Sequence, residues 1–264
     1  MIEIDRVEVS FNRGQPTERR ALDGVSLRIP AGQFVTVIGS NGAGKSTLLN
    51  LLAGDVFADE GRVAIDGVDL GTRPAWARAR EVARVFQDPL AGTCGDLSIE
   101  ENLSLAAARG QVRGLGAALD GRLRARFRER LAGLGLGLEN RLGDRMGLLS
   151  GGQRQVVTLV MATLQPMKIL LLDEHTAALD PRTAAFVLEL TDRIVADAGL
   201  TVLMVTHSMR QALDHGGRTI MMHEGRIALD VAGDSRASLG VPDLLAMFED
   251  VRGETLADDA LLLG

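Results

Sequence analysis

The sequence predicts an α/β fold with a parallel sheet, and three short apolar runs carry this prediction. They are Phe34–Ile38, Ile169–Leu172 and Val202–Val205, and each is followed by polar or glycine residues. Short apolar runs with such flanks are typical of strands that are buried on both faces. In open α/β sheets, ligands bind at the carboxyl ends of the parallel strands. The residues that follow these runs are therefore the first candidates for a functional site.

The first run leads into the glycine-rich segment Gly39–Thr47, with the sequence GSNGAGKST, and then into the apolar run Leu48–Leu52. A strand, a turn of the form G-x-x-x-x-G-K-[ST] and a helix, in this order, are the context of a phosphate-binding P-loop. Its glycines permit backbone conformations that other residues avoid, so that successive N–H groups converge on one anion. The start of the helix adds unpaired N–H donors and the positive end of its dipole.

Two side chains of this segment have predicted roles in holding a nucleotide. Lys45 is placed to reach the β- and γ-phosphates, and the hydroxyl of Ser46 is placed to bind Mg²⁺. The alternative is a glycine-rich turn between a strand and a helix, with an ordinary surface lysine. Because every fixed position of the motif is filled, we interpret the segment as the binding site of a nucleoside triphosphate.

The composition limits the class of protein. The formal net charge is −6, which argues against a protein whose main task is to bind nucleic acid. Cys94 is the only cysteine, so no disulfide forms within the chain and a reducing compartment is permitted. The N-terminus is acidic where a secretory signal is basic, and no apolar run approaches the ~20 residues of a membrane-spanning helix. We expect a cytoplasmic protein that reaches a membrane only through a partner.

The N-terminal region is predicted to form a small antiparallel sheet. Apolar and polar residues alternate over residues 2–9 with a slip at Asp5–Arg6, and they alternate again in Val25–Ile29 and Gly61–Gly67. This period of two is typical of strands that have one face in water.

Two residues near strand ends have two interpretations each. Phe11 stands before the polar loop Asn12–Arg20, and it is either a core residue or a flat surface on which an adenine stacks. Gln87 follows the short apolar run Val82–Phe86 and precedes Asp88-Pro89, which ends regular structure. It is either an ordinary turn residue or an amide that contacts Mg²⁺ or the attacking water.

Residues 98–143 are predicted to form a helical lobe inserted into the α/β core. Ser98 and Glu101 have the spacing of a capping box, and a second helix is predicted from about Ala117 to Leu134. Arginines at every second position of that helix scatter around it instead of lining one face. They are Arg122, Arg124, Arg126, Arg128 and Arg130. We interpret this helix as solvated, with contact to anionic lipid or nucleic acid as the alternative.

The segment Leu149–Arg154, with the sequence LSGGQR, is a second candidate anion site. Ser150 is a favourable N-cap, and the two glycines after it leave N–H groups open at the start of a helix. By itself this pattern is only a capped helix start. A domain with one nucleotide has little use for two such sites, unless the second binds a nucleotide that another copy of the chain holds.

Two carboxylates follow the run Ile169–Leu172. Asp173 suits a contact with Mg²⁺, and Glu174 is the candidate to polarise a water in line with the γ-phosphate. The alternative is a strand that runs out into solvent. Asp180 lies in a turn, directly before a helix that begins at Pro181.

His207 follows the run Val202–Val205. A lone histidine is more often structural than catalytic, but the end of a parallel core strand favours contact with the γ-phosphate. The other three histidines lack this placement, and no cluster of metal ligands emerges. The tail from Pro242 is amphipathic and then acidic, and it is either a peripheral cap or a partner surface.

These features occur in one chain in the following order: the P-loop, Gln87, Leu149–Gln153, Asp173–Glu174, Asp180 and His207. The set resembles the nucleotide-binding subunits of ATP-binding-cassette (ABC) transporters, from about Ile2 to about Asp230. The resemblance implies a P-loop NTPase domain over residues 1–230, with a RecA-like core, an N-terminal antiparallel β-subdomain and an inserted α-helical subdomain at about 88–155. Residues 231–264 then form a C-terminal extension.

The resemblance also implies ATP and Mg²⁺ as cofactors and a head-to-tail homodimer. Each ATP then lies between the P-loop of one copy and Ser150–Gln153 of the other. Ser46, Gln87 and Asp173 are the implied contacts of Mg²⁺. The implied nucleotide-binding residues are Phe11, Gly39, Ser40, Asn41, Gly42, Ala43, Gly44, Lys45, Ser46, Thr47, Ser150, Gly151, Gly152, Gln153 and Asp180.

The implied catalytic residues are Glu174, His207, Gln87 and Lys45. By this resemblance Glu174 is the general base, His207 steadies the γ-phosphate and Gln87 signals to the membrane domain. Asp180 couples the two sites of the dimer. Phe11 matches the position that stacks on adenine, where tyrosine is commoner, and His175 stands where many family members have proline.

Three further stretches are similar to one branch of this family, the bacterial ATPases of uptake systems assigned to tryptophan or tyrosine. They are Glu174–Pro181, Gln87–Thr93 and Met204–Met209. Such a system pairs two copies of this chain, on the inner face of the membrane, with permease subunits and an extracytoplasmic substrate-binding protein.

Four other functions compete with import. An ABC ATPase that acts on DNA has long coiled coils between the P-loop and the second anion site, whereas about a hundred residues separate Lys45 from Ser150 here. One that acts on ribosomes carries two cassettes per chain. A P-loop kinase leaves Leu149–Gln153 and His207 without a role. Export instead of import stays open, because the membrane partner sets the direction.

Overall fold

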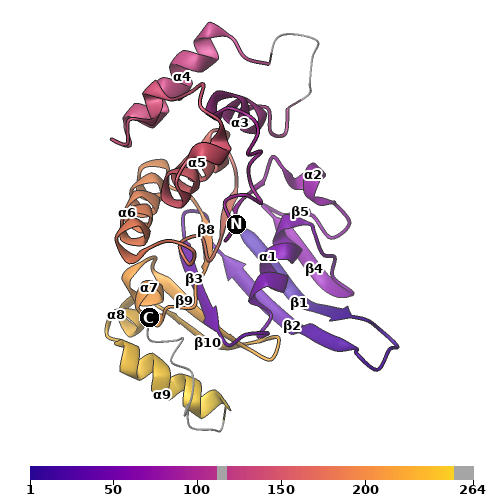
Figure 1. Ribbon diagram of the computed structural model, residues 1–264. Helices are drawn as coiled ribbons and strands as arrows, with labels where there is room; N and C mark the ends of the chain where they lie inside the picture. The colour runs from indigo at the N-terminus through magenta and orange to yellow at the C-terminus, as the bar shows by residue number, and fades with distance from the viewer. Residues whose placement is uncertain (112–117, 253–264) are drawn as a thin grey trace. The chain divides into compact units, whose positions relative to one another are not determined.

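The computed structural model describes residues 1–111 and 118–252, which fall into two compact units (Figure 1). The first unit combines Met1–Arg78 with Gly199–Gly264, and the second is Ala79–Ala198. The predicted helix start at Ala117 lies outside the described residues. Over the two described ranges, no helix has both the length and the apolar character that crossing a membrane requires.

The first unit contains an antiparallel sheet with the strand order β2-β1-β4-β5. Its strands are β1 (Ile2–Phe11), β2 (Arg19–Ile29), β4 (Glu60–Ile65) and β5 (Val68–Asp69). This confirms the prediction from the alternating residues. The slip in their pattern is a bulge between Ile4 and Val7, where Arg6 has φ of 45° and the next apolar side chain returns to the core face. The loop before β2 is shorter than predicted, because β2 already begins at Arg19.

The second sheet of this unit has the order β10-β9-β3-β8, with β3 parallel to both of its neighbours. Its strands are β3 (Phe34–Gly39), β8 (Val202–Val205), β9 (Arg218–His223) and β10 (Arg226–Ala232). The turn at Glu224 and Gly225, both with positive φ, joins the hairpin β9–β10. Strands β3 and β8 are the predicted apolar runs, and their residues are buried apart from the half-buried Phe34.

Helices α1 (Lys45–Ala53), α2 (Ala75–Arg78) and α7 (Met209–Asp214) also belong to the first unit. The tail adds α8 (Gly233–Ala237) and α9 (Val241–Arg252). Leu244 and Phe248 of α9 are fully buried in one cluster with Ile38, Met209 and Met221. The amphipathic part of the tail is therefore a structural part of this unit.

The second unit contains the parallel strand pair β6 (Val82–Val85) and β7 (Ile169–Asp173). Its helices are α3 (Ile99–Ala107), α4 (Gly121–Ala132), α5 (Gly151–Thr163) and α6 (Pro181–Ala198). Short 3₁₀ turns occur at Leu138–Asn140 and Met146–Leu148.

Helices α3, α4 and α5 lie together (Figure 1) and share one apolar cluster, in which Leu103, Phe127 and Val157 are fully buried. The predicted capping box at the start of α3 is present, with Ser98 and Glu101 bonded reciprocally. Helix α4 begins at Gly121, later than predicted, because the carboxylate of Asp120 accepts a hydrogen bond from the Leu123 N–H and caps it. The proposed limits of the inserted helical subdomain, about 88–155, remain a prediction.

Candidate nucleotide-binding site

The P-loop connects β3 to α1 in the first unit, and its glycines have the backbone conformations that the sequence predicts. Gly39, Gly42 and Gly44 have φ of +146°, +78° and +104°. A Cβ atom at Gly44 would lie 2.5 Å from the carbonyl oxygen of Ala21. A side chain at Gly44 is therefore excluded both by the backbone conformation and by the neighbouring chain.

The start of α1 is open to an anion. Gly44 is its N-cap and supplies no side-chain hydrogen bond, whereas α3, α4, α5 and α7 each have a side-chain cap. Ser46 and Thr47 lie in the first turn, where N–H groups have no partner within the helix. An anion at this point receives both these donors and the positive end of the helix dipole.

Lys45 is buried at the base of the loop, with 5% of its surface exposed. Its ammonium donates hydrogen bonds to the carbonyl oxygens of Gly39, at 2.6 Å, and Ser40, at 3.0 Å. The loop thus holds the positive charge beside its own backbone, at the position that the sequence assigns to the β- and γ-phosphates.

His207 and the P-loop leave the same edge of one sheet. Strands β3 and β8 are parallel, with Val37 opposite Val205, and the Thr206 N–H donates to the Val37 carbonyl oxygen at 3.1 Å. His207 comes directly after this bond. His207 thus lies at the carboxyl end of a parallel core strand, where the sequence places it, and its contact with the γ-phosphate stays a prediction.

Phe11 ends β1 with 40% of its surface exposed, so it is not a core residue. An exposed aromatic ring can stack on a flat base. This outcome removes one of the two interpretations of Phe11 and leaves the other as a proposal.

In the second unit, Gln87 and the two carboxylates also lie at one sheet edge. Strands β6 and β7 are parallel, with Val85 opposite Leu172, so the residues that follow them emerge together. Gln87 is exposed, and Asp173 and Glu174 are half-buried. Glu174 has φ of 45°, a left-handed conformation that is rare for glutamate and turns the chain sharply after Asp173.

A residue that the sequence interpretation missed, Arg84 of β6, pairs with Asp173. Its Nη2 donates to Oδ2 of Asp173 at 2.6 Å, and the two side chains are only 13% and 14% exposed. The guanidinium also lies 4.7 Å from the centre of the Phe86 ring. The sequence did contain one sign of this pair, because Arg84 is a charged residue within the apolar run Val82–Phe86. The alternation of apolar and polar residues does not explain its presence there.

The second candidate anion site, Leu149–Arg154, begins helix α5 as predicted. Ser150 is the N-cap, and it exchanges hydrogen bonds with Gln153 in a capping box. Arg154 donates from Nη2 to the carbonyl oxygens of Gly147, at 3.0 Å, and Leu149, at 3.1 Å. This arginine fixes the approach to helix α5, and the Gln153 N–H of its first turn donates to the Ser150 hydroxyl.

Gly151 and Gly152 differ in what surrounds them. Gly151 is exposed, whereas Gly152 is buried where α5 approaches α6. A Cβ atom at Gly152 would overlap the methyl group of Thr183. The second glycine is thus required by packing within this unit, a reason that the pattern of the motif did not reveal.

Asp180 is exposed and caps α6, because its carboxylate accepts a hydrogen bond from the Thr183 N–H at 3.1 Å. Hydrogen bonds from Thr183 hold the pKa of Asp180 below its usual value. His175, by contrast, is buried and its Nε2 lies 3.2 Å from the Thr191 hydroxyl. The histidine that replaces the commoner proline is therefore a core residue of the second unit.

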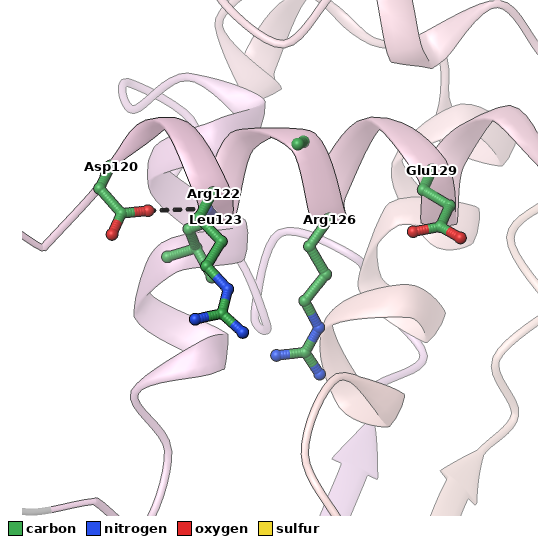
Figure 2. A pocket seen from close by; sticks show the side chains of 6 residues that line it. Asp120, Arg122, Leu123, Arg126 and Glu129 are labelled. Carbon is green, nitrogen blue, oxygen red and sulfur yellow. Dashed lines mark hydrogen bonds between the residues drawn. The ribbon is translucent and has the colours of Figure 1, made fainter.

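A hollow along α4 is not part of the predicted site. It is lined by one side of this helix, and Figure 2 shows Arg122 and Arg126 pointing to the same side. Arg126 donates to the Leu164 carbonyl oxygen at 2.8 Å, and Arg124 pairs with Glu100 at 2.8 Å. Two of the five arginines thus bind other parts of their own unit, which the interpretation as a solvated helix did not predict. Over residues 1–111 and 118–252, no cluster of His, Cys, Asp and Glu side chains could hold a metal ion by itself.

Comparisons with known proteins agree with this arrangement. Residues 22–177 match the family described as ABC transporter. The chain is 41% identical over 249 residues to a tyrosine transport ATP-binding protein of Clostridioides difficile, with 94% of this chain and 99% of the relative covered. It is 38% identical to the aliphatic sulfonates import ATP-binding protein SsuB of Escherichia coli, with 82% of this chain and 77% of that relative covered.

Solved structures give the same result. A dimeric bacterial ABC transporter cassette has a TM-score of 0.75 and 30% identity, and covers 88% of this chain and 98% of its own. The dimeric post-hydrolysis state of an ATP-binding cassette, bound to ADP and Pi, has a TM-score of 0.74 at 29% identity, with the same coverage. The predicted α/β fold of the P-loop NTPases is confirmed by these neighbours.

Proposed function

This chain belongs to the ABC transporter family, and from this premise we propose that it powers the import of a solute through separate permease subunits. It is an ATP-binding protein and an ATPase whose hydrolysis is coupled to transport. The proposal concerns the finer points: the head-to-tail dimer, the role of each site residue, the direction of transport and the class of solute.

The observation that carries the proposal is the presence of two glycine-bearing helix starts with different capping. The start of α1 has no side-chain cap, and the start of α5 is capped by Ser150. Both are suited to anions, but one ATP needs only one P-loop. A head-to-tail dimer gives the second start a ligand, the γ-phosphate of the nucleotide that the partner copy holds. The dimeric cassette bound to ADP and Pi, at 29% identity, supports this arrangement.

We assign the chemistry within that dimer as follows. Lys45 and the N–H groups of the P-loop bind the phosphates, and Phe11 stacks on the adenine. Glu174 accepts a proton from the attacking water, and His207 donates a hydrogen bond to the γ-phosphate. Gln87 reports the state of the γ-phosphate, and Asp180 couples the two sites across the dimer. The positions of all these residues at strand ends and helix starts support these roles.

Magnesium fits the donor set of these residues. The hydroxyl of Ser46, the amide oxygen of Gln87 and the carboxylate of Asp173 are the oxygen ligands that Mg²⁺ prefers, together with phosphate oxygens. The ion pair of Asp173 with Arg84 shows that this carboxylate already stands beside a cation. Mg²⁺ supplies charge neutralisation to the phosphates when it is bound. Ser46, Gln87 and Asp173 would hold the ion, and the P-loop would orient the phosphates beside it.

The solute we propose is an amino acid or a related small molecule. The relative at 41% identity, whose whole length is matched, is a tyrosine transport ATP-binding protein, and the SsuB relative serves import of aliphatic sulfonates. Both support import. The partners are then two permease subunits and an extracytoplasmic substrate-binding protein, with no nucleic acid, and the chain lies in the cytoplasm on the inner face of the membrane.

The test is to purify the tagged chain from detergent-solubilised cells and identify what accompanies it. A polytopic permease that co-purifies and raises the ATPase rate is the expected result. Ribosomes or DNA in its place would contradict transport while leaving the ATP chemistry intact. Lys45→Ala should weaken ATP binding by about tenfold or more, since it removes a charged hydrogen-bond donor. Tight ATP binding by this variant would contradict the assignment of the P-loop.

A further inference from the structure

Arg19 lies between Phe11, the proposed stacking partner of adenine, and the P-loop. It is the first residue of β2, and its partner across the strand pair is Phe11. Its guanidinium Nη2 donates a hydrogen bond to the carbonyl oxygen of Gly42 in the P-loop. A methyl group at Gly42 would collide with this guanidinium. Phe11, Arg19 and Gly42 therefore follow one another along one face of the first unit.

Arg19 carries a positive charge that no carboxylate neutralises in the described part of the chain. Its neighbour Arg20 differs, because Arg20 pairs with Asp23 at 2.8 Å and with Glu8 at 3.8 Å. Arg19 is exposed, and among the residues that the structure describes its guanidinium makes one hydrogen bond, to the Gly42 carbonyl oxygen. A guanidinium has five N–H donors, so most of them remain available at the rim of the P-loop.

We propose that Arg19 is a further nucleotide-binding residue, which binds the phosphates from the side of the ribose. This inference rests on the proposed roles of the P-loop and Phe11. If the adenine stacks on Phe11 and the β- and γ-phosphates lie in the P-loop, the ribose and the α-phosphate lie between Phe11 and the loop. Arg19 is located there, because it is paired with Phe11 and bonded to Gly42. Guanidinium and phosphate form charge-assisted hydrogen bonds, which are frequently bidentate.

The hydrogen bond to Gly42 leaves room for this role. One N–H of Arg19 stays on the carbonyl oxygen and holds the guanidinium in place, while other N–H groups of the same fork face the ligand. Lys45, in contrast, is buried and donates to two other carbonyl oxygens of the loop, those of Gly39 and Ser40. The polyphosphate is then flanked by one buried and one exposed cation.

The experiment compares the full-length chain with the variants Arg19→Ala, Arg19→Gln and Arg19→Lys, and with Arg20→Ala as the matched control. Binding of ADP, ATP and adenosine is measured by calorimetry at two salt concentrations. Arg19→Ala and Arg19→Gln should weaken ADP and ATP binding by about tenfold, and Arg20→Ala should not. Adenosine, which has no phosphate, should bind all variants equally. The salt dependence of ADP binding should fall when the charge at position 19 is removed.

Arg19→Gln removes the charge and, because glutamine is two bonds shorter than arginine, also the reach to the Gly42 carbonyl oxygen. Arg19→Lys keeps the charge on a longer side chain, so it should bind ADP better than Arg19→Gln and Arg19→Ala. Normal ADP binding by Arg19→Gln, with weak binding by Arg19→Ala, would show a purely structural role and overturn the proposal. Equal binding by wild type and all variants would overturn it as well, while the P-loop assignment would stand. Failure of the wild-type chain to bind ADP would instead contradict the proposed function itself.

Discussion

Arg84 and Asp173 form an ion pair across the neighbouring parallel strands β6 and β7, with 2.6 Å between Nη2 and Oδ2. Both side chains are largely buried, so water solvates the negative charge of Asp173 only weakly. The positive charge of the Arg84 guanidinium stabilises this carboxylate in its place. The same carboxylate is the proposed contact of Mg²⁺. In the absence of a metal ion, Arg84 therefore supplies the positive charge that this position requires.

Removal of Arg84 is expected to make stability depend on the metal. Arg84→Met should lower the free energy of unfolding by about 1–3 kcal/mol in EDTA, since it leaves a carboxylate partly buried without a partner. In Mg²⁺ and ADP the loss should shrink, because a bound cation replaces the missing charge. Urea unfolding in both solutions measures this, with Arg128→Met on the exposed side of α4 as control. An equal loss of unfolding free energy in both solutions would show that no bound metal ion replaces the charge of Arg84, and would contradict this prediction.

Arg78 is expected to be essential for the folding of the first unit. It is 1% exposed, and its guanidinium donates to the carbonyl oxygens of Leu51, Leu52, Leu70 and Arg73. Two of these belong to the last turn of α1, whose carbonyl groups have no other helical partner. Arg78→Leu leaves the four oxygens without this donor, three of them in buried surroundings, and we expect a loss of about 2–5 kcal/mol in urea unfolding.

Arg73→Leu is the control for this measurement, because Arg73 is exposed and its backbone carbonyl is retained in the variant. It should change stability by less than about 0.5 kcal/mol. A similar loss in both variants would show that Arg78 acts through the segment as a whole and not through its four hydrogen bonds.

Gly152 is expected to be required for packing and not only for binding. Because a Cβ atom at Gly152 would overlap the methyl group of Thr183, Gly152→Ala should destabilise the second unit by about 1–3 kcal/mol. Thr183→Ala removes that methyl group, so the double variant should recover most of the loss. Thermal unfolding of the four chains forms a double-mutant cycle. Additive losses in the double variant would contradict the overlap.

The capping box of α3 gives a prediction about pH. The hydrogen bond from the Ser98 N–H lowers the pKa of Glu101 from its usual value. A carboxyl with a lower pKa in the folded state stabilises the fold above its unfolded pKa, about 4.3, and this contribution is lost as the pH falls through the folded value. Glu101→Gln keeps the acceptor but has no charge to titrate. The stability difference between wild type and this variant should therefore shrink between pH 6 and about pH 3, and a constant difference in urea unfolding would contradict the assignment.

The local parts of the fold were predictable because their signals lie within a few residues. Apolar runs gave β3, β7 and β8, alternation gave β1, β2 and β4, and the spacing of Ser98 with Glu101 gave a helix start. The helix starts of the two candidate anion sites were predictable because each is one continuous segment that joins to its own helix. Short elements with weak patterns, such as α2, β5 and α8, were not found.

Contacts between distant positions were not predictable from patterns. Arg84 and Asp173 are far apart in the sequence, and so are Arg19 and Gly42. Each pair forms only because the fold brings two distant segments together. The pattern of a single sequence does not show which side chains then meet. The overlap at Gly152 has the same origin, since Thr183 belongs to the next helix. The sequence also left the tail undecided, because the burial of Leu244 and Phe248 depends on the surface that the sheet and α7 provide.

The central claim is that two copies of this chain close over ATP and hydrolyse it with Glu174 as the base. Glu174→Gln keeps the size of the side chain but cannot accept the proton, so the nucleotide should remain intact between the two copies. Light scattering of this variant should show the mass doubling on addition of Mg²⁺ and ATP, with ATP hydrolysis nearly abolished. Adding Ser150→Phe to the same chain should prevent the doubling, because it blocks the start of α5. A variant that hydrolyses ATP at the wild-type rate and stays monomeric would contradict the claim.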